Sequence, residues 1–245
     1  MEINEKYLRD KLSLDKEKIQ RILLMYDIAK KISADNKNGL LLKGGTALLF
    51  CYGLPRYSTD LDYDGFNYNF DIMDDIKSVI NSNGLKLDRI NVKKDTDTVK
   101  RFMIHYKEAE NNPIKLEISF RNIDDADHVN DKRARINDIN TYNIKYLASD
   151  KIDTFLKRTA ARDIFDASFL IQHYPDSLNK GLIEKCKNKL TTLGLDQMEN
   201  IIKNDEVIKN FDCDDILVNL ENNINKYLSN ANKIKANTDN CSIKR

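Results

Sequence analysis

The chain has 245 residues, of which 41% are apolar and 32% charged, a composition that suits one large or two modest soluble domains. A formal net charge of only +1 excludes a uniformly basic surface, so a nucleic acid would have to bind to a local basic patch. The cysteines lack CxxC spacing and no apolar run could cross a bilayer, so we expect no zinc cluster, no membrane partner and a cytoplasmic location.

The first predicted elements are a helix, a strand and a second helix. Apolar residues recur at helical spacing over residues 16–33, and the Asn-rich stretch that ends at Gly39 predicts a turn. The short apolar run of residues 40–42 predicts a buried strand. Helical character resumes over residues 46–52 and ends at Gly53-Leu54-Pro55.

A second group of predicted elements contains most of the strands. Residues 60–64 alternate polar and apolar side chains, which predicts a strand with its carboxylates on one face. Residues 71–81 read as a helix. Three strand-like runs follow, over residues 85–92, 98–106 and 114–120, and the short turns between them predict an antiparallel meander.

The pattern becomes helical near residue 143 and remains so. We therefore expect an α/β domain over residues 1–142 and a helical domain over residues 143–245, which together make an α+β fold. The polar tail after Leu228 is expected to fray. The helical runs in this part are residues 144–159, 163–173, 178–193 and 216–228.

A glycine pair follows the first predicted strand. Gly44 and Gly45 lie where the strand leads into a helix, and glycine allows the backbone to approach a phosphate closely. The N-terminus of a helix also favours anions, and Thr46 could add a hydroxyl contact or cap the helix. The pattern indicates a phosphate site, with a tight strand-to-helix turn as the structural alternative.

Three carboxylates indicate a metal site. Asp60 and Asp62 are two residues apart on a predicted strand, so they would repel each other unless a cation such as Mg²⁺ lay against them. Glu117 lies between two apolar residues of a later strand, and a third carboxylate could help to hold two metal ions about 3.5–4 Å apart. The alternative for Glu117 is an exposed acid on a half-buried strand.

These motifs, taken in order, resemble those of the AbiEii/AbiGii toxin family within the polymerase beta-like nucleotidyltransferase superfamily. The resemblance spans about residues 40 to 170, and the third acid is Glu117 where many relatives have Asp. The matching positions are Gly44-Gly45-Thr46-Ala47-Leu48, Arg56, Ser58, Asp60-Leu61-Asp62, Lys115-Leu116-Glu117-Ile118, Lys151, Arg158 and Arg162-Asp163-Ile164-Phe165-Asp166.

The resemblance implies a fold and an activity. It implies a mixed-sheet nucleotidyltransferase core with flanking helices and a helical C-terminal lobe. It further implies an enzyme that moves a nucleoside monophosphate from an NTP to an RNA acceptor, the tRNA 3′ end, as a toxin with a separately encoded antitoxin. The implied cofactor is Mg²⁺, with Mn²⁺ as an alternative.

The resemblance also implies residue roles. The metal ligands would be Asp60, Asp62 and Glu117, and these three with Lys151 and Asp163 form the expected catalytic set. The nucleotide would be bound by Gly44, Gly45, Thr46, Arg56, Ser58 and Lys151.

Several alternatives stay open from the residues alone. The charged residues after residue 150, above all Arg158 and Asp166, could form a salt-bridge cluster between helices. Arg56 and Ser58 could fix their own loop. The activity could be nucleotidyl transfer to a small molecule such as an aminoglycoside, or nucleotide binding without turnover. Two basic patches could contact RNA or only solvate the surface; they comprise Lys86, Arg89, Lys93, Lys94, Lys100 and Arg101, and the stretch from Lys132 to Arg135.

Overall fold

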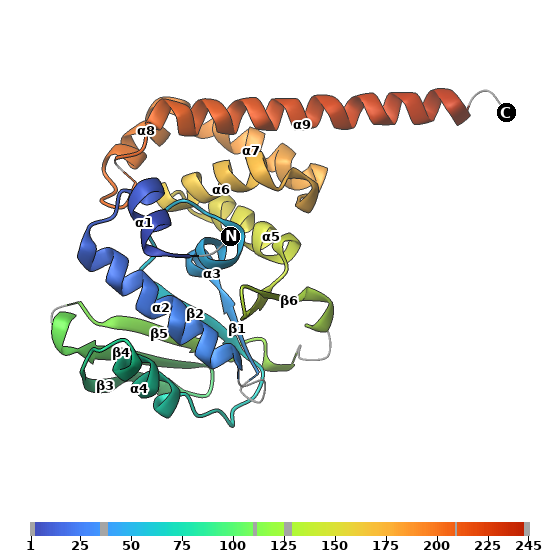
Figure 1. Cartoon of the computed structure of the whole chain (residues 1–245). Coiled ribbons are helices and arrows are strands. Elements are labelled where there is room, and N and C mark those ends of the chain that lie inside the picture. Colours follow the sequence, from blue (N-terminus) through green and yellow to red (C-terminus); the bar gives the residue numbers. More distant parts are fainter. Residues whose placement is uncertain (1–2, 35–38, 110–111, 125–128, 209, 243–245) are drawn as a thin grey trace. The chain divides into compact units, whose positions relative to one another are not determined.

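The computed structural model divides into two compact units, Met1–Asn143 and Ile144–Arg245. Figure 1 shows the chain coloured along its sequence. The structure describes residues 3–34, 39–109, 112–124, 129–208 and 210–242. Part of the predicted turn before Gly39 and the start of the turn before Pro113 lie outside these residues.

The first unit is built on a seven-stranded mixed sheet, in the order β3-β4-β5-β2-β1-β7-β6, which confirms the expected mixed-sheet α+β fold. The pairs β1–β7 and β2–β5 are parallel, and the other neighbouring pairs are antiparallel. The strands are β1 (Leu40–Lys43), β2 (Asp60–Gly65), β3 (Leu87–Thr96), β4 (Val99–Tyr106), β5 (Ile114–Ser119), β6 (Arg133–Ile136) and β7 (Ile139–Tyr142).

Four helices accompany this sheet. They are α1 (Glu5–Leu12), α2 (Lys16–Ala34), α3 (Gly44–Tyr52) and α4 (Met73–Ser82). Helix α2 runs across the sheet, contacts β1 and β7, and packs beside α4, which contacts β3 (Figure 1). The alternation of β2 and β5 places Leu61, Leu116 and Ile118 in the core, so the polar side chains between them point to the other face of the sheet.

The hairpin of β6 and β7 was not predicted from the sequence. Its turn residues, Asn137 and Asp138, have positive φ angles of 51° and 63°, the conformation of a two-residue turn that Asn and Asp tolerate. Each strand has only four residues, so the alternation of side chains is too short to be distinctive. The Asn-Asp pair is the signal that could have identified the hairpin.

The second unit consists of helices. They are α5 (Ile144–Lys157), α6 (Ala161–His173), α7 (Lys180–Leu193), α8 (Leu195–Lys203) and α9 (Cys213–Ser242). The expectation of a frayed tail after Leu228 was wrong, because α9 continues to Ser242. Helix α9 contacts α6, α7 and α8, and its buried side chains lie between Cys213 and Ile224, so tertiary contacts anchor the start of the helix.

Three short 3₁₀ turns complete the described elements: η2 (Lys107–Ala109), η4 (Asn130–Lys132) and η5 (Pro175–Ser177). Among the residues that the structure describes, no helix combines the length and the apolar character that crossing a bilayer would require.

Candidate active site

The turn from β1 into α3 depends on its two glycines. Gly44 has a φ of 74°, a left-handed conformation that side chains rarely adopt. A Cβ placed at Gly45 would lie 2.7 Å from Nη2 of Arg56, so a side chain there would force the guanidinium to move. Helix α3 starts at Gly44, and the first N–H groups of a helix have no partners within it. The turn therefore presents backbone donors at the positive end of a helix dipole, which suits a phosphate.

Three other predicted nucleotide contacts are buried beneath this turn: Thr46, Arg56 and Ser58. The hydroxyl of Thr46 lies 2.7 Å from that of Ser58 and donates a 2.5 Å hydrogen bond to the backbone oxygen of Asp60. Arg56 donates to the backbone oxygen of Tyr57. As placed, these side chains fasten the loop before β2 to the start of α3, and their contact with a nucleotide stays a prediction.

The carboxylates of β2 lie beside the glycine turn. Oδ2 of Asp62 is 3.5 Å from the point where a Cβ on Gly44 would sit. The side chains of Asp60 and Asp62 are 34% and 38% exposed, so both remain accessible from solvent. The structure thus brings together the two motifs, the glycine pair and the aspartate pair, that the sequence placed in different elements.

A lysine that was not predicted as a site residue lies between these two aspartates. Nζ of Lys115 is 2.7 Å from Oδ2 of Asp60 and 3.7 Å from Oδ1 of Asp62. Partial burial lowers the pKa of Lys115, but its hydrogen bond to Asp60 and the nearby carboxylates outweigh this effect, and the pKa lies above its ordinary value of 10.5. Burial raises the pKa of Asp62, against a smaller lowering by Lys115. Lys115 therefore supplies positive charge between the two aspartates.

Glu117 has a basic partner of its own. It is the register partner of Asp62 on the neighbouring parallel strand, but its Oε2 accepts a 2.6 Å hydrogen bond from Nε of Arg101 on β4. Within the described parts of the chain, no three acidic, histidine or cysteine side chains form a group that could hold a metal ion. The expected set of three metal-binding carboxylates is therefore not assembled in this structure.

A third aspartate of β2, Asp64, has a structural role. Its side chain is 2% exposed, pairs with Nζ of Lys43 at 2.5 Å and accepts a 2.8 Å hydrogen bond from the hydroxyl of Tyr142. Lys43 is the last residue of β1, directly before the glycine pair. Asp64 therefore fixes the strand end that positions the turn. The spacing of Asp60, Asp62 and Asp64 showed a shared face, but only the structure separates the buried member from the exposed two.

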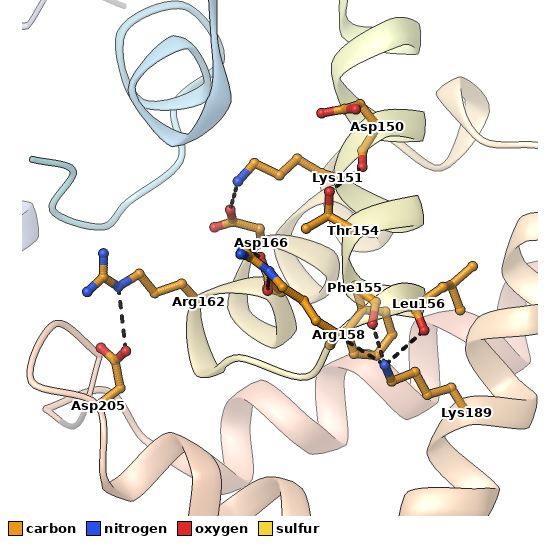
Figure 2. Close-up of polar contacts among 11 residues, drawn as sticks. Asp150, Lys151, Thr154, Phe155, Leu156, Arg158, Arg162, Asp166, Lys189 and Asp205 are labelled. Atoms are coloured by element: carbon orange, nitrogen blue, oxygen red, sulfur yellow. Dashed lines mark hydrogen bonds and ion pairs between the residues drawn. The ribbon is translucent and has the colours of Figure 1, made fainter. Parts of the chain in front are cut away.

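The two predicted site residues of the helical unit form ion pairs between α5 and α6. Figure 2 shows Lys151 of α5 pointing at Asp166 of α6, and the two charged atoms are 2.9 Å apart. Arg158 donates two hydrogen bonds, of 2.7 and 3.2 Å, to the carboxylate of Asp163. Asp166 and Asp163 are 0% and 2% exposed. In this unit the geometry matches a salt-bridge cluster between helices, which the sequence left open as the alternative to a role in the active site.

The same cluster is extended by a lysine that caps α5. Lys189 of α7 donates hydrogen bonds to the backbone oxygens of Phe155, Leu156 and Arg158 (Figure 2). The last carbonyls of a helix have no partners within it, so this ammonium satisfies them and favours the negative end of the helix dipole. Lys189 therefore fixes the end of α5 from which Arg158 reaches Asp163.

The aspartate pair of β2 fits a magnesium ion. Mg²⁺ commonly binds through one or two carboxylates and takes its remaining oxygen ligands from water and substrate phosphates. Asp60 and Asp62 supply two accessible carboxylates, and the ammonium of Lys115 occupies a cation position between them. The glycine turn at Gly44 places phosphate-binding backbone beside the same carboxylates. The residues present therefore suit a cation bound together with a polyphosphate.

Comparison with known proteins gives a family model and several solved structures. Residues 30–230 match the model described as the nucleotidyl transferase AbiEii toxin of type IV toxin–antitoxin systems. The crystal structure of JHP933 from Helicobacter pylori has a TM-score of 0.80 at 27% identity and covers 94% of this chain and 99% of its own. A second Helicobacter pylori structure, described as a candidate nucleotidyltransferase, has a TM-score of 0.76 at 29% identity, with 90% and 99% covered.

A more distant structure shares the fold. The nucleotidyltransferase toxin MenT4 of Mycobacterium tuberculosis has a TM-score of 0.54 at 12% identity, and the match covers 92% of this chain and 89% of that one. No curated protein sequence matches the chain.

Proposed function

The chain belongs to the AbiEii family of nucleotidyltransferase toxins, and from this premise we propose that it transfers a nucleoside monophosphate from an NTP to an RNA acceptor, the 3′ end of a tRNA. The observation that carries the proposal is the position of Asp60 and Asp62 beside the glycine turn. A phosphate site and a pair of accessible carboxylates, brought together from two elements, are what a metal-assisted reaction at a polyphosphate needs.

The chain supplies the binding groups for the triphosphate. We assign its phosphates to the backbone N–H groups that follow Gly44, because these donors point out of the start of α3. Asp60 and Asp62 would hold Mg²⁺, or Mn²⁺ in its place. When bound, this ion supplies positive charge that neutralises the triphosphate and makes the acceptor hydroxyl more acidic.

In the reaction itself, the hydroxyl oxygen of the acceptor forms a bond to the α-phosphorus, and the bond from this phosphorus to the pyrophosphate oxygen breaks. Glu117 is the residue that we assign to orient the hydroxyl and accept its proton, because it lies on the strand next to Asp62. Arg101 holds this carboxylate in place through its 2.6 Å hydrogen bond. The chain then contributes positioning and electrostatic stabilisation, without a covalent intermediate.

The helical unit enters the proposal through the family resemblance. We retain Lys151 as a contact of the triphosphate, since a lysine is a mobile point charge suited to terminal phosphates. Asp163 is retained as a positioning residue, because its carboxylate is buried and both its oxygens accept hydrogen bonds from Arg158. A toxin of this family acts with an antitoxin, and we propose such a partner and a cytoplasmic location for this chain.

The experiment that tests the proposal uses the full chain with each of the four α-³²P-labelled NTPs and Mg²⁺, in separate reactions with total tRNA and with an aminoglycoside mixture. We expect label in the tRNA with at least one NTP, and no label after Asp60→Ala in a variant that keeps the circular dichroism spectrum of the parent. Label only in the aminoglycoside, or NTP retained without any product, would refute RNA as the acceptor.

A further inference from the structure

A row of charged side chains crosses five strands of the sheet and passes through the aspartate pair. Residues that pair directly across neighbouring strands point to the same face. The register pairs join β1, β2, β5, β4 and β3 in turn, so one face carries a continuous row. Its members are Lys43, Asp62, Glu117, Arg101 and Lys94.

The outer end of this row, on β4 and β3, is basic. Arg101 pairs in register with Lys94, and Arg89 pairs with His105, which lies four residues after Arg101 on β4 and therefore on the same face. We call Arg101, Lys94 and Arg89 the basic track. They belong to the first basic patch of the sequence, and the sheet register divides that patch between two faces.

The acids of the same hairpin fall mainly on the opposite face. Asp95 pairs in register with Lys100, which precedes Arg101 and so points away from it. Asp88 precedes Arg89 at an irregularity of the β3–β4 register, and these two neighbours form an ion pair. The acids that dilute the patch in the sequence are thus separated from Lys94 and Arg101 by the strand alternation.

The track has free donors. Lys94 is exposed and has no ion-pair partner among the described residues. Arg101 is 41% exposed and uses only its Nε toward Glu117, which leaves its two terminal amino groups without hydrogen bonds to the described residues. An arginine of this kind can bind a carboxylate and a phosphate at once, because its guanidinium has five donors.

The arginines of the second basic patch, which runs from Lys132 to Arg135, have more contacts within the unit than Lys94 of the track. Arg135 donates hydrogen bonds to the backbone oxygen of Ser33 and to Oδ1 of Asn140, and Arg133 lies over the ring of Phe66. These arginines fix the β6 edge of the sheet. None of these partners is a carboxylate, but the contacts hold both side chains at that edge, whereas Lys94 has no such contact among the described residues. We therefore choose the track on β4 and β3.

We propose that the basic track binds the phosphate backbone of the RNA acceptor and leads its 3′ end to Asp60 and Asp62. The inference rests on the proposed function. Lys94 is three strands from Asp62, a distance of about 14 Å, so successive phosphates of one RNA strand span the track while its terminal hydroxyl reaches the carboxylates. A small-molecule acceptor would not extend this far, so changes at the track should weaken the binding of an RNA acceptor and leave a small-molecule acceptor unaffected.

The test measures RNA binding without chemistry. A fluorescein-labelled tRNA is titrated with the full chain in the absence of NTP, at several salt concentrations, and the anisotropy gives Kd. In the double variant Lys94→Gln with Arg89→Gln, we expect Kd to rise about tenfold and the slope of log K against log salt to fall by about two, since two phosphate contacts are lost. Lys77→Gln is the control, because Lys77 is an exposed lysine of α4 away from the row, and it should bind like the parent.

The outcomes separate this inference from the proposed function. Unchanged Kd and salt slope in the double variant, with label still transferred to tRNA by the parent protein, would overturn the track and leave the function in place. Transfer by the parent to an aminoglycoside instead of tRNA would overturn both.

Discussion

Each unit of the molecule contains a cluster of aspartates with basic partners, and the two clusters differ in burial. In the α/β unit, the carboxylates of Asp60 and Asp62 are more than a third exposed and share the single ammonium of Lys115. In the helical unit, Asp166 and Asp163 are almost fully buried and each has its own basic partner. The same residue types therefore make an under-neutralised, open site in one unit and a closed structural link in the other.

This difference shows that aspartates in a motif can have a structural or a binding role, depending on their burial and on how many positive charges neutralise them. A buried carboxylate with a matched partner is costly to expose and stabilises one arrangement of the helices around it. An accessible pair with less than one positive charge for each carboxylate retains capacity for another cation. Removing charges from each cluster and measuring the free energy of unfolding tests this difference.

The largest effect is expected for Lys151→Met, which removes the lysine from beside the fully buried carboxylate of Asp166. The free energy of unfolding should fall by about 3–5 kcal/mol, because a buried carboxylate then loses its charged partner. Urea unfolding followed by far-UV circular dichroism measures this change, and Lys157→Met on the exposed side of α5 should alter it by less than about 0.5 kcal/mol. An unchanged free energy of unfolding in Lys151→Met would contradict a stabilising role of its pair with Asp166.

A smaller loss is expected for Asp163→Asn. The amide cannot accept both hydrogen bonds from Arg158, and a loss of about 1.5–3 kcal/mol follows from weakening a charge-assisted contact. The loss stays below that of Lys151→Met, because Arg158 is 67% exposed and remains hydrated. Urea unfolding gives the free energy, and hydrogen exchange at the start of α6 should accelerate. Equal losses of unfolding free energy in Lys151→Met and Asp163→Asn would show that the burial of the basic partner does not determine how much stability is lost.

The smallest change in the free energy of unfolding, and the only increase among these three variants, is expected for Asp62→Asn. Burial raises the pKa of Asp62, so its ionised form is disfavoured in the folded state and its charge lowers stability at neutral pH. The neutral amide should stabilise the protein by about 0.5 kcal/mol, a small gain because the side chain is 38% exposed and water screens its charge.

The pH dependence of this gain has a defined direction. A group whose pKa is raised on folding contributes stability that is complete below its unfolded pKa, 3.8 for an aspartate, and lost as the pH rises through the folded value. The gain from Asp62→Asn should therefore be present at neutral pH and disappear toward pH 3.8. Thermal unfolding at pH values across this range measures it, and a gain that grows as the pH falls would contradict the assigned shift.

Local patterns predicted much of the fold. The helical spacing of residues 16–33 and the short apolar run of residues 40–42 correspond to α2 and β1, within one residue at each end. The meander of three strands is present as β3, β4 and β5 with antiparallel pairing. These elements were predictable because their signals lie in neighbouring residues.

The partners of the site residues were not predictable in the same way. Arg101 reaches Glu117 only through the register of β4 on β5, and Lys115 reaches Asp60 only through the parallel pairing of β5 with β2. Asp64 continues the alternation of the exposed aspartates and has no local feature that marks it as buried. Its partner Tyr142 comes from β7, far along the chain. Sequence spacing identified the acids, and the charges that balance them depend on long-range pairing.

The most direct test of the central claim is whether the aspartate pair of β2 binds a divalent cation together with a nucleotide. Mn²⁺ is titrated into the protein with an α,β-methylene analogue of each NTP, and electron paramagnetic resonance reports the free ion. The double variant Asp60→Asn with Asp62→Asn should weaken Mn²⁺ binding at least about tenfold, or about 1.4 kcal/mol. Asp88→Asn with Asp95→Asn, the same charge change on exposed residues, should not. Equal Mn²⁺ affinity in the parent and the Asp60–Asp62 variant would contradict the account.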